Sequence, residues 1–224
     1  MCPCEIARID QKQQELTQSE KVNKTKALFG QEQLGPKFRN ATFENWVKLP
    51  GTQNAYQEAV GYVQERRWRK GEGLLFFGGT GNGKSHLAAA IFNELVPIGV
   101  AAIFKVMPDL LGKIQSTYGK NGRDVDESMI INTLCEADLV VLDDLGSERL
   151  TDWSLEKMFR IINSLYTNEK ALIITTNCDI QKEFKEKVGA RIYDRIIEMC
   201  RLVENNGDSY RIKIATARMK AIGE

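Results

Sequence analysis

Histidine and cysteine, the usual ligands of structural zinc, are scarce in this sequence of 224 residues. His86 is the single histidine, and of the five cysteines only Cys2 and Cys4 lie close together in the chain. A tetrahedral zinc site needs four ligands, and no cysteine or acidic cluster near this pair supplies the other two. The pair therefore predicts a disordered start, or the remnant of a metal-binding module, rather than a zinc site. The odd number of cysteines, without an export signal, also argues against a disulfide framework.

Long apolar runs and an excess of one charge are missing as well. No stretch approaches the roughly 18 consecutive apolar residues that a membrane helix needs, and the first residues are not a basic segment followed by an apolar one. We therefore expect a cytoplasmic protein without a membrane partner. Lys and Arg total 31 against 30 for Asp and Glu, so no overall positive field attracts nucleic acid. Any contact with DNA must come from a local patch.

The composition divides the chain near residue 37. Residues 1–37 are rich in Gln, Lys and Glu and poor in aromatics, which predicts a flexible arm that could dock a partner. Residues 38–224 form the predicted domain, in which short apolar runs alternate with amphipathic segments. The runs expected to be strands are 74–77, 101–106, 139–142, 171–176 and the weaker 201–204. Such alternation predicts an α/β fold with a five-stranded parallel sheet sandwiched between helices.

A glycine-rich loop follows the first of these strands and precedes a predicted helix. It fits the pattern G-x-x-x-x-G-K-[ST] and consists of Gly78, Gly79, Thr80, Gly81, Asn82, Gly83, Lys84 and Ser85. The glycines let backbone N–H groups converge on phosphate oxygens at a helix N-terminus. We expect Lys84 to bind the β- and γ-phosphates of ATP, or the phosphates of ADP, and the Ser85 hydroxyl to ligate Mg²⁺.

Two carboxylates follow the third predicted strand, in the order that a P-loop ATPase requires. Asp143 is the candidate Mg²⁺ ligand, and Asp144 is the candidate group that orients the attacking water. Asn177 leaves the fourth strand, where an amide would position this water without adding negative charge. The alternative for Asp143 and Asp144 is that they are two solvated acids at the end of a strand. The alternative for Asn177 is that Thr-Thr-Asn is only a common way to end a strand.

Six segments together resemble the AAA+ ATPases of the DnaC/DnaI helicase-loader type, which are close to the IstB transposition helpers. They are 38–46, 78–86, 142–146, 175–177, 191–195 and 208–211. The resemblance covers about residues 38–213 and implies a P-loop AAA+ core. We expect no separate C-terminal helical lid, because too few residues follow Asn177. The resemblance further implies a loader that binds the replicative DnaB-type helicase through its N-terminal part and uses ATP to place it on single-stranded DNA.

The same resemblance implies roles for individual residues. His86 belongs to the nucleotide site, Asn177 resembles the sensor-1 residue, and Arg211 resembles a sensor-2 arginine. Arg195 resembles the arginine finger that is presented to a neighbouring subunit, with Arg191 as the alternative, and this implies self-association on ATP or DNA. A solvated basic face is the other explanation for these arginines.

One more segment occupies the place where these loaders resemble replication initiators in carrying a DNA-contacting helix. Its candidate contacts are Lys113, Ser116, Thr117, Tyr118 and Lys120. They supply phosphate donors, positive charge and a ring that can stack on a base. The alternative is an amphipathic helix that packs Leu110, Leu111 and Ile114 into the core.

Helicase loading with slow ATP hydrolysis is the first interpretation of these features. An IstB-like transposition helper ATPase is the second, although the short N-terminal arm argues mildly against it. A nucleotide-gated adaptor with little hydrolysis is the third. It stays open because Asp144 stands where many related ATPases have glutamate, and because a lid is not expected.

Overall fold

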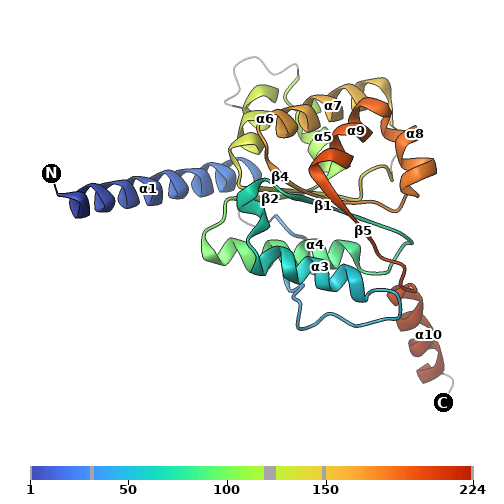
Figure 1. Ribbon diagram of the computed structural model, residues 1–224. Coiled ribbons are helices and arrows are strands. Elements are labelled where there is room, and N and C mark those ends of the chain that lie inside the picture. Colours follow the sequence, from blue (N-terminus) through green and yellow to red (C-terminus); the bar gives the residue numbers. More distant parts are fainter. Residues whose placement is uncertain (1, 31–32, 119–124, 148–149, 223–224) are drawn as a thin grey trace.

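The computed structural model describes residues 2–30, 33–118, 125–147 and 150–222. Its centre is a sheet of five parallel strands in the order β2-β3-β4-β1-β5 (Figure 1). The strands are β1 (Gly73–Phe77), β2 (Ala102–Val106), β3 (Leu139–Asp143), β4 (Ala171–Thr175) and β5 (Cys200–Glu204). The expected five-stranded parallel sheet is confirmed, and each end of a strand lies within one residue of its predicted position.

Both faces of the sheet are buried. Successive side chains of a strand point to opposite faces, so Val140 and Leu142 of β3 join one core cluster while Leu139 and Val141 join the other. All four side chains are fully buried. Burial on both faces explains why the strands are continuous apolar runs in the sequence.

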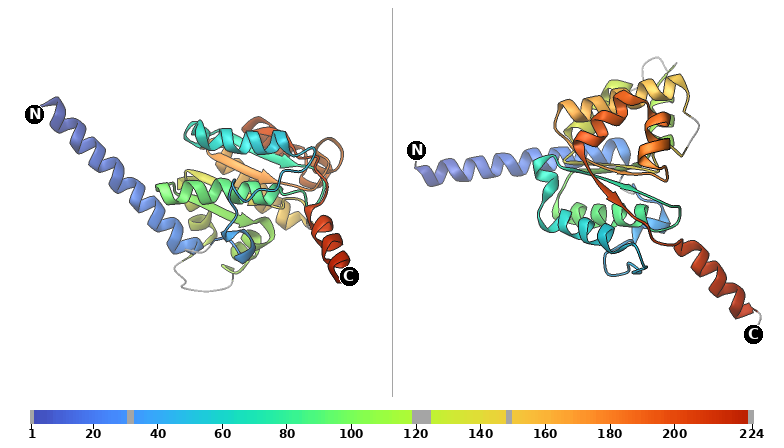
Figure 2. Two further views of the ribbon diagram at one scale, coloured as in Figure 1. Left: turned by 90° about the horizontal axis from the view of Figure 1, so that it is seen from below. Right: turned by 45° about the vertical axis from the view of Figure 1, so that its right-hand side comes forward.

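Helices form a layer on each face of the sheet (Figures 1 and 2). One layer contains α5 (Met107–Gln115), α6 (Glu127–Glu136), α7 (Asp152–Thr167), α8 (Lys185–Val188) and α9 (Ala190–Met199). The other contains α3 (Gln53–Gln64) and α4 (Lys84–Leu95), with the short α2 (Pro36–Arg39) packed against α4. Local sequence sets the starts of two helices, because Asp126 caps α6 and Thr151 caps α7 by accepting a hydrogen bond from a backbone N–H.

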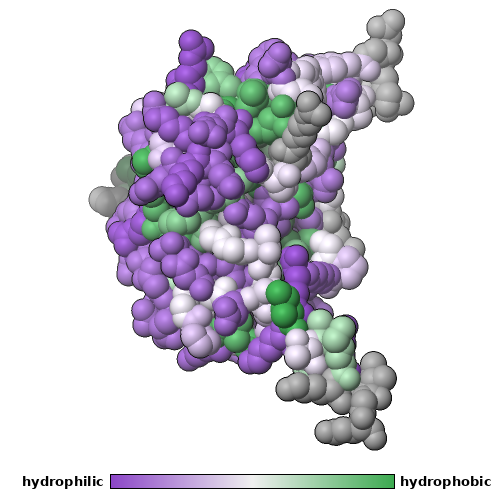
Figure 3. Space-filling model, turned by 90° about the vertical axis from the view of Figure 1, so that its right-hand side faces the viewer, coloured by the Kyte–Doolittle hydropathy of each residue, from purple (hydrophilic) through white to green (hydrophobic). Residues whose placement is uncertain are grey.

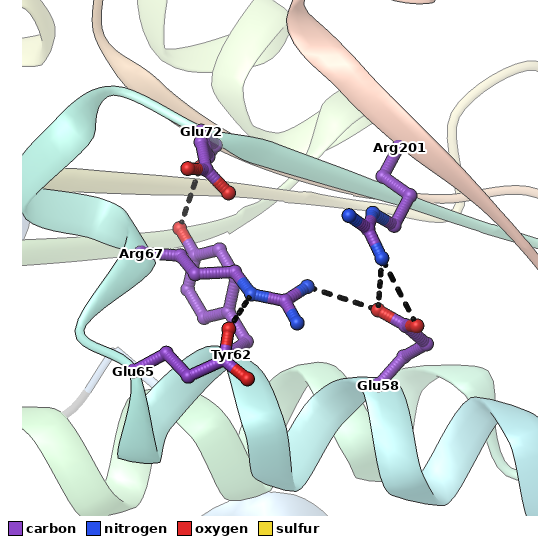
Figure 4. A network of polar contacts seen from close by, with 6 residues as sticks. All are labelled: Glu58, Tyr62, Glu65, Arg67, Glu72 and Arg201. Atoms are coloured by element: carbon purple, nitrogen blue, oxygen red, sulfur yellow. Dashed lines mark hydrogen bonds and ion pairs between the residues drawn. The ribbon is translucent and has the colours of Figure 1, made fainter.

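A polar network fastens α3 to the β5 edge of the sheet (Figure 4). Arg67 donates to Glu65 over 2.7 Å and to Glu58 over 2.9 Å, and Arg201 of β5 donates to Glu58 over 3.2 Å. The buried hydroxyl of Tyr62 completes the group by donating to a backbone carbonyl. Arg67 therefore has a structural role, since its guanidinium binds the carboxylates of both Glu58 and Glu65.

The first helix, α1 (Pro3–Phe29), packs on the domain with its C-terminal half, while its N-terminal half projects from the body (Figures 1 and 2). Gln18 donates to the carbonyl of Gly99 over 2.9 Å, and both Gln18 and Lys21 donate to the carboxylate of Asp138. The expected division at residue 37 stays a prediction. Two apolar side chains before that position are buried: Phe29 at the end of α1 joins one core cluster, and Leu34 after α1 joins the other.

The last helix, α10 (Tyr210–Ile222), projects from the other end of the molecule (Figure 1). In the described part of the chain, which extends to residue 222, α10 is the element that follows β5. In AAA+ proteins with a lid domain, the lid would begin at this position. Ile212 and Met219 on α10 are exposed. On the face drawn in Figure 3, hydrophobic side chains form small separate groups among hydrophilic ones. None of the helices in the described residues is both long and apolar enough to span a membrane.

Replacing Phe29 with Ala should lower the free energy of unfolding by about 3 kcal/mol, because it empties a buried aromatic site. Leu16→Ala is the matched control on the same helix, since Leu16 is 59% exposed, and it should change the free energy by less than about 0.5 kcal/mol. Urea unfolding followed by circular dichroism measures both. Equally small changes in the two variants would contradict the packing of α1 on the domain.

Candidate active site

The glycine-rich loop joins β1 to α4 at the carboxyl end of the sheet. Gly78, Gly81 and Gly83 have φ angles of 128°, 78° and 101°, which residues with a Cβ rarely adopt. A Cβ on Gly83 would also collide with the ring of Trp46. The path of this loop therefore requires glycine, and the first turn of α4 follows it directly.

Lys84 begins α4 and is only 4% exposed. Its Nζ donates to the carbonyl oxygens of Gly78 over 2.9 Å and Gly79 over 2.6 Å, and to Oδ1 of Asn82 over 3.2 Å. Burial lowers the pKa of Lys84 to about 8, although the nearby carboxylates favour its charged form. A phosphate group in the loop would supply the counter-charge that neutral carbonyls lack.

Asp143 ends β3 and is almost buried. Its Oδ1 accepts a hydrogen bond of 2.6 Å from Oγ1 of Thr175, and the hydroxyl of Ser85 also donates to this carboxylate. Burial raises the pKa of Asp143, while the two hydroxyl donors act in the opposite direction. A carboxylate beside a hydroxyl is a pair of hard oxygen ligands. The pair fits Mg²⁺, which proteins commonly hold with one or two carboxylates and the phosphates of a substrate.

Asp144 turns out of β3 with a φ of 58°, in the left-handed region. Its N–H donates to Oγ1 of Thr175 over 2.9 Å, and its Oδ1 accepts a hydrogen bond of 2.7 Å from Nδ2 of Asn177. The amide and the second carboxylate therefore meet, as expected for neighbouring strands β3 and β4. Both side chains line the same cavity as Lys84.

This cavity has a volume of about 920 Å³, which is in the range of small-molecule sites. The glycine-rich loop and the polar ends of β3 and β4 form one side of it, and the segment before α3 forms another. On that side the ring of Trp46 packs against His86, with centroids 5.3 Å apart. Nε2 of His86 lies 2.9 Å from the carbonyl oxygen of Thr42. The structure thus places His86 in the wall of the candidate nucleotide site.

The chain after β5 returns to the glycine-rich loop. Asn205 and Asn82 each donate from the side-chain amide to the other's backbone carbonyl, and the N–H of Tyr210 donates to the carbonyl of Gly81 over 2.9 Å. Oδ1 of Asn205 is buried without a hydrogen-bond partner in the described residues. Arg211 follows at the start of α10 and lines the cavity, near enough to Lys84 to lower its pKa. Its position suits the expected sensor-2 role, which stays a prediction.

Arg191 and Arg195 lie on α9 and do not line this cavity. Nε of Arg195 donates to Oδ1 of Asn163 over 2.9 Å, and its guanidinium lies 4.8 Å from the ring centroid of Phe159 and 5.6 Å from that of Tyr166. Arg191 is exposed one turn away, and the described residues include no partner for its side chain. Arg195 is therefore engaged within its own subunit, whereas Arg191 is free to reach another molecule.

The candidate DNA contacts lie on α5 and just after it, except for Lys120, which lies outside the described residues. The hydroxyls of Ser116 and Thr117 donate to backbone carbonyls three residues earlier. Lys113 is half-buried, and its ammonium lies 5.8 Å from the ring centroid of Phe29. These contacts are internal to the protein, and DNA binding by this group stays a prediction.

Tyr118 has partners inside the protein as well. Its hydroxyl donates to Glu127 over 2.6 Å, and its ring packs edge-on against Trp153 with centroids 6.3 Å apart. Nζ of Lys157 lies 5.9 Å from the ring centroid of Tyr118. The ring nevertheless remains partly exposed, so one part of its surface is open to a base.

Cys2 and Cys4 lie at the exposed start of α1, with their sulfur atoms 2.7 Å apart. His86, the other residue weighed as a zinc ligand, lines the nucleotide cavity. Within the part of the chain that the structure describes, no three His, Cys, Asp or Glu side chains gather in a way that could hold a metal ion.

The sequence pattern of the family described as "IstB-like ATP binding protein" matches residues 47–218, which include the glycine-rich loop, both carboxylates and Asn177. This chain belongs to the IstB-like ATP-binding family. The match covers most of the domain and accounts for the nucleotide cavity.

The IstB-like chain is similar to proteins of replication initiation. It is 28% identical over 201 residues to the replicative helicase loader DnaC of Escherichia coli K12. This alignment covers 89% of this chain and 80% of that protein. The crystal structure of the DnaC helicase loader superimposes with a TM-score of 0.69 at 29% identity, over 77% of this chain and all of that one. The replication initiator DnaA bound to AMPPCP and single-stranded DNA gives a TM-score of 0.65 at 27% identity, over 85% of this chain and 56% of DnaA. The predicted AAA+ core and the resemblance to helicase loaders are confirmed.

Sequence analysis missed two residues of this IstB-like site. Thr175 contacts the carboxylate of Asp143 and the backbone N–H of Asp144, and Asn205 pairs with Asn82 of the loop. A signal for Thr175 existed, since it is a hydroxyl at the end of a strand expected beside that of Asp143. Asn205 had none, because its contact depends on how the chain returns after β5.

Lys84→Ala should raise the dissociation constant for ATP about 100-fold, since a charged hydrogen bond to phosphate is worth up to about 3 kcal/mol. The fold should persist, because Lys84 contacts the loop and not the core. Lys105→Ala is the control: burial lowers the pKa of Lys105 too, but this lysine does not line the cavity. Isothermal calorimetry measures both variants. Equal ATP affinity in Lys84→Ala and the wild type would contradict the assignment of the site.

Proposed function

We propose that this chain loads a replicative DnaB-type helicase onto single-stranded DNA in an ATP-dependent reaction. The observation that carries the proposal is the cavity in which Lys84, Asp143 and Asp144 meet. It occurs in a chain that is similar to a replicative helicase loader over 89% of its length. This combination supports ATP hydrolysis as the chemistry and helicase placement as its result.

In the proposed reaction, Lys84 binds the β- and γ-phosphates and balances the negative charge that spreads over the γ-phosphate oxygens. Ser85 and Asp143 would hold Mg²⁺, which supplies further positive charge to the phosphates. Asp144 orients the attacking water and accepts its proton. The amide of Asn177 lies beside Asp144 and shares the positioning of that water without adding charge.

The geometry also supports slow hydrolysis by the isolated chain. Oδ1 of Asp144 already accepts a hydrogen bond from Asn177, and Arg191 and Arg195 are both absent from the cavity wall. An arginine finger from α9 would therefore have to come from a neighbouring subunit. The same observations favour a second candidate function, a nucleotide-gated adaptor that hydrolyses little ATP.

The free half of α1 is the proposed contact for the helicase. Ile6, Ile9 and Leu16 are exposed there, and helical geometry places all three on one side of the helix. This half projects away from the domain, so a partner can reach it without moving the core (Figure 2). We propose that the segment around Lys113 and Tyr118 binds single-stranded DNA. The similar fold of DnaA, which has been solved in complex with single-stranded DNA, supports this proposal.

A loading assay tests the function. A DnaB-type helicase is added to single-stranded circular DNA that carries an annealed oligonucleotide and is coated with single-stranded-DNA-binding protein. With this chain and ATP present, the helicase should displace the oligonucleotide, whereas helicase alone or helicase with the Lys84→Ala variant should not. Equal displacement with and without the chain would contradict helicase loading.

The same assay separates the candidate functions. An adaptor would support displacement equally well when its Asp144 is replaced by Asn, although that variant should not hydrolyse ATP. A transposition helper would leave the helicase inactive and would bind duplex DNA in the presence of ATP.

A second prediction concerns the arginine that completes a neighbouring site. Arg191→Ala should abolish the rise in ATP hydrolysis per molecule with protein concentration, while ATP binding by the monomer stays unchanged. Arg195→Ala should instead lower the midpoint of thermal unfolding, since it removes contacts with Asn163, Phe159 and Tyr166. Mixing the arginine variant with Lys84→Ala subunits should restore part of the activity, because each supplies the half-site that the other lacks. Loss of the concentration dependence in a stably folded Arg195→Ala protein would identify Arg195 as the finger.

A further inference from the structure

Two adjacent threonines at the end of β4 are fully buried but have different partners. Oγ1 of Thr175 donates to Oδ1 of Asp143 over 2.6 Å and accepts the N–H of Asp144 over 2.9 Å. Oγ1 of Thr176 donates instead to the backbone carbonyl of Leu145 over 2.7 Å and accepts a backbone N–H from Cys178. The first hydroxyl therefore contacts the carboxylate of Asp143 and the backbone of Asp144, and the second contacts only backbone groups.

The hydroxyl of Thr175 can make both hydrogen bonds at once. A hydroxyl carries one proton and two lone pairs, so donation to Asp143 leaves a lone pair for the N–H of Asp144. The first bond holds one oxygen of the Asp143 carboxylate inside the sheet. The opposite orientation of the hydroxyl is excluded, because a carboxylate cannot donate and a backbone N–H cannot accept.

The second hydrogen bond acts at a strained point of the backbone. Asp144 has a φ of 58°, which costs free energy in a residue with a Cβ and persists only where surrounding contacts hold it. The bond from its N–H to Thr175 is such a contact. This turn directs the Asp144 side chain to Asn177 and to the cavity.

We propose that Thr175 is the positioning residue for both carboxylates of the ATPase site. It does not line the cavity, so it acts through Asp143 and Asp144 and not on the nucleotide. The proposal rests on the proposed function, because that function gives the two carboxylates their roles in binding Mg²⁺ and orienting water.

Thr175→Val tests the proposal, since it removes the hydroxyl and keeps the shape of the side chain. We expect kcat to fall at least about tenfold, the scale of a lost buried hydrogen bond to a charged group. The Mg²⁺ concentration for half-maximal binding of a fluorescent ATP analogue should rise several-fold. Affinity for the same analogue in EDTA should stay within about twofold of wild type, because Lys84 and the loop do not contact Thr175.

Two further variants separate positioning from general stability. Thr175→Ser keeps the hydroxyl and should restore kcat and the Mg²⁺ dependence to within about threefold of wild type. Thr176→Val also removes a buried hydroxyl from the end of β4, but it should leave both quantities within about twofold. Wild-type behaviour of Thr175→Val, equal losses in Thr176→Val, or failure of Thr175→Ser to restore the Mg²⁺ dependence would each overturn the proposal.

Folding is followed by circular dichroism, and Thr175→Ala replaces Thr175→Val in every measurement if the valine variant does not fold. The readouts also distinguish this proposal from the proposed function. If the wild-type chain hydrolyses no ATP even with helicase and DNA, helicase loading by hydrolysis fails. The Mg²⁺ dependence of analogue binding still decides the role of Thr175.

Discussion

The site depends on the order in which five parallel strands lie side by side. The chain passes from β1 through α4 to β2 at the far edge of the sheet, and β4 then fills the position next to β1. Because the strands are parallel, the glycine-rich loop after β1, the carboxylates after β3 and Asn177 after β4 all lie at one edge. Ligands of open α/β sheets bind at such a reversal of strand order. Residues that are about a hundred positions apart in the chain, such as Thr80 and Asn177, therefore line one cavity.

Within that cavity, burial works against the charged forms of Lys84 and Asp143. It lowers the pKa of Lys84 and raises the pKa of Asp143, so each group alone is less stable in its charged form. The protein offsets this cost with hydrogen bonds: loop carbonyls accept from Lys84, and the hydroxyls of Ser85 and Thr175 donate to Asp143. Phosphate and a divalent cation carry the charges that complement both groups. The site is thus arranged for a ligand of that chemistry before the ligand arrives.

Local patterns predicted the strands, the glycine-rich loop and the polar ends of β3 and β4, because each depends on a few consecutive residues. The docking of α1 was not predictable in this way, since Gln18 contacts Asp138 across more than half the chain. Composition describes residues 1–37 as polar as a whole, but it averages over Phe29, a single aromatic that the domain buries. Arg195 shows the same limit. The resemblance implies that Arg195 is a finger, which stays a prediction, whereas its stacking on Phe159 and Tyr166 depends on how α7 and α9 pack.

The two projecting helices connect to the site in different ways. α10 is tied to the loop directly, because the segment before it bonds to Asn82 and Gly81. α1 is anchored at both ends of β2: Gln18 binds Gly99 just before the strand, and Lys105 within it donates to the carbonyl of Phe29. The last residue of this strand, Val106, lines the nucleotide cavity. The docked half of α1 thus contacts β2, which reaches the nucleotide site, and also Asp138, which lies directly before β3.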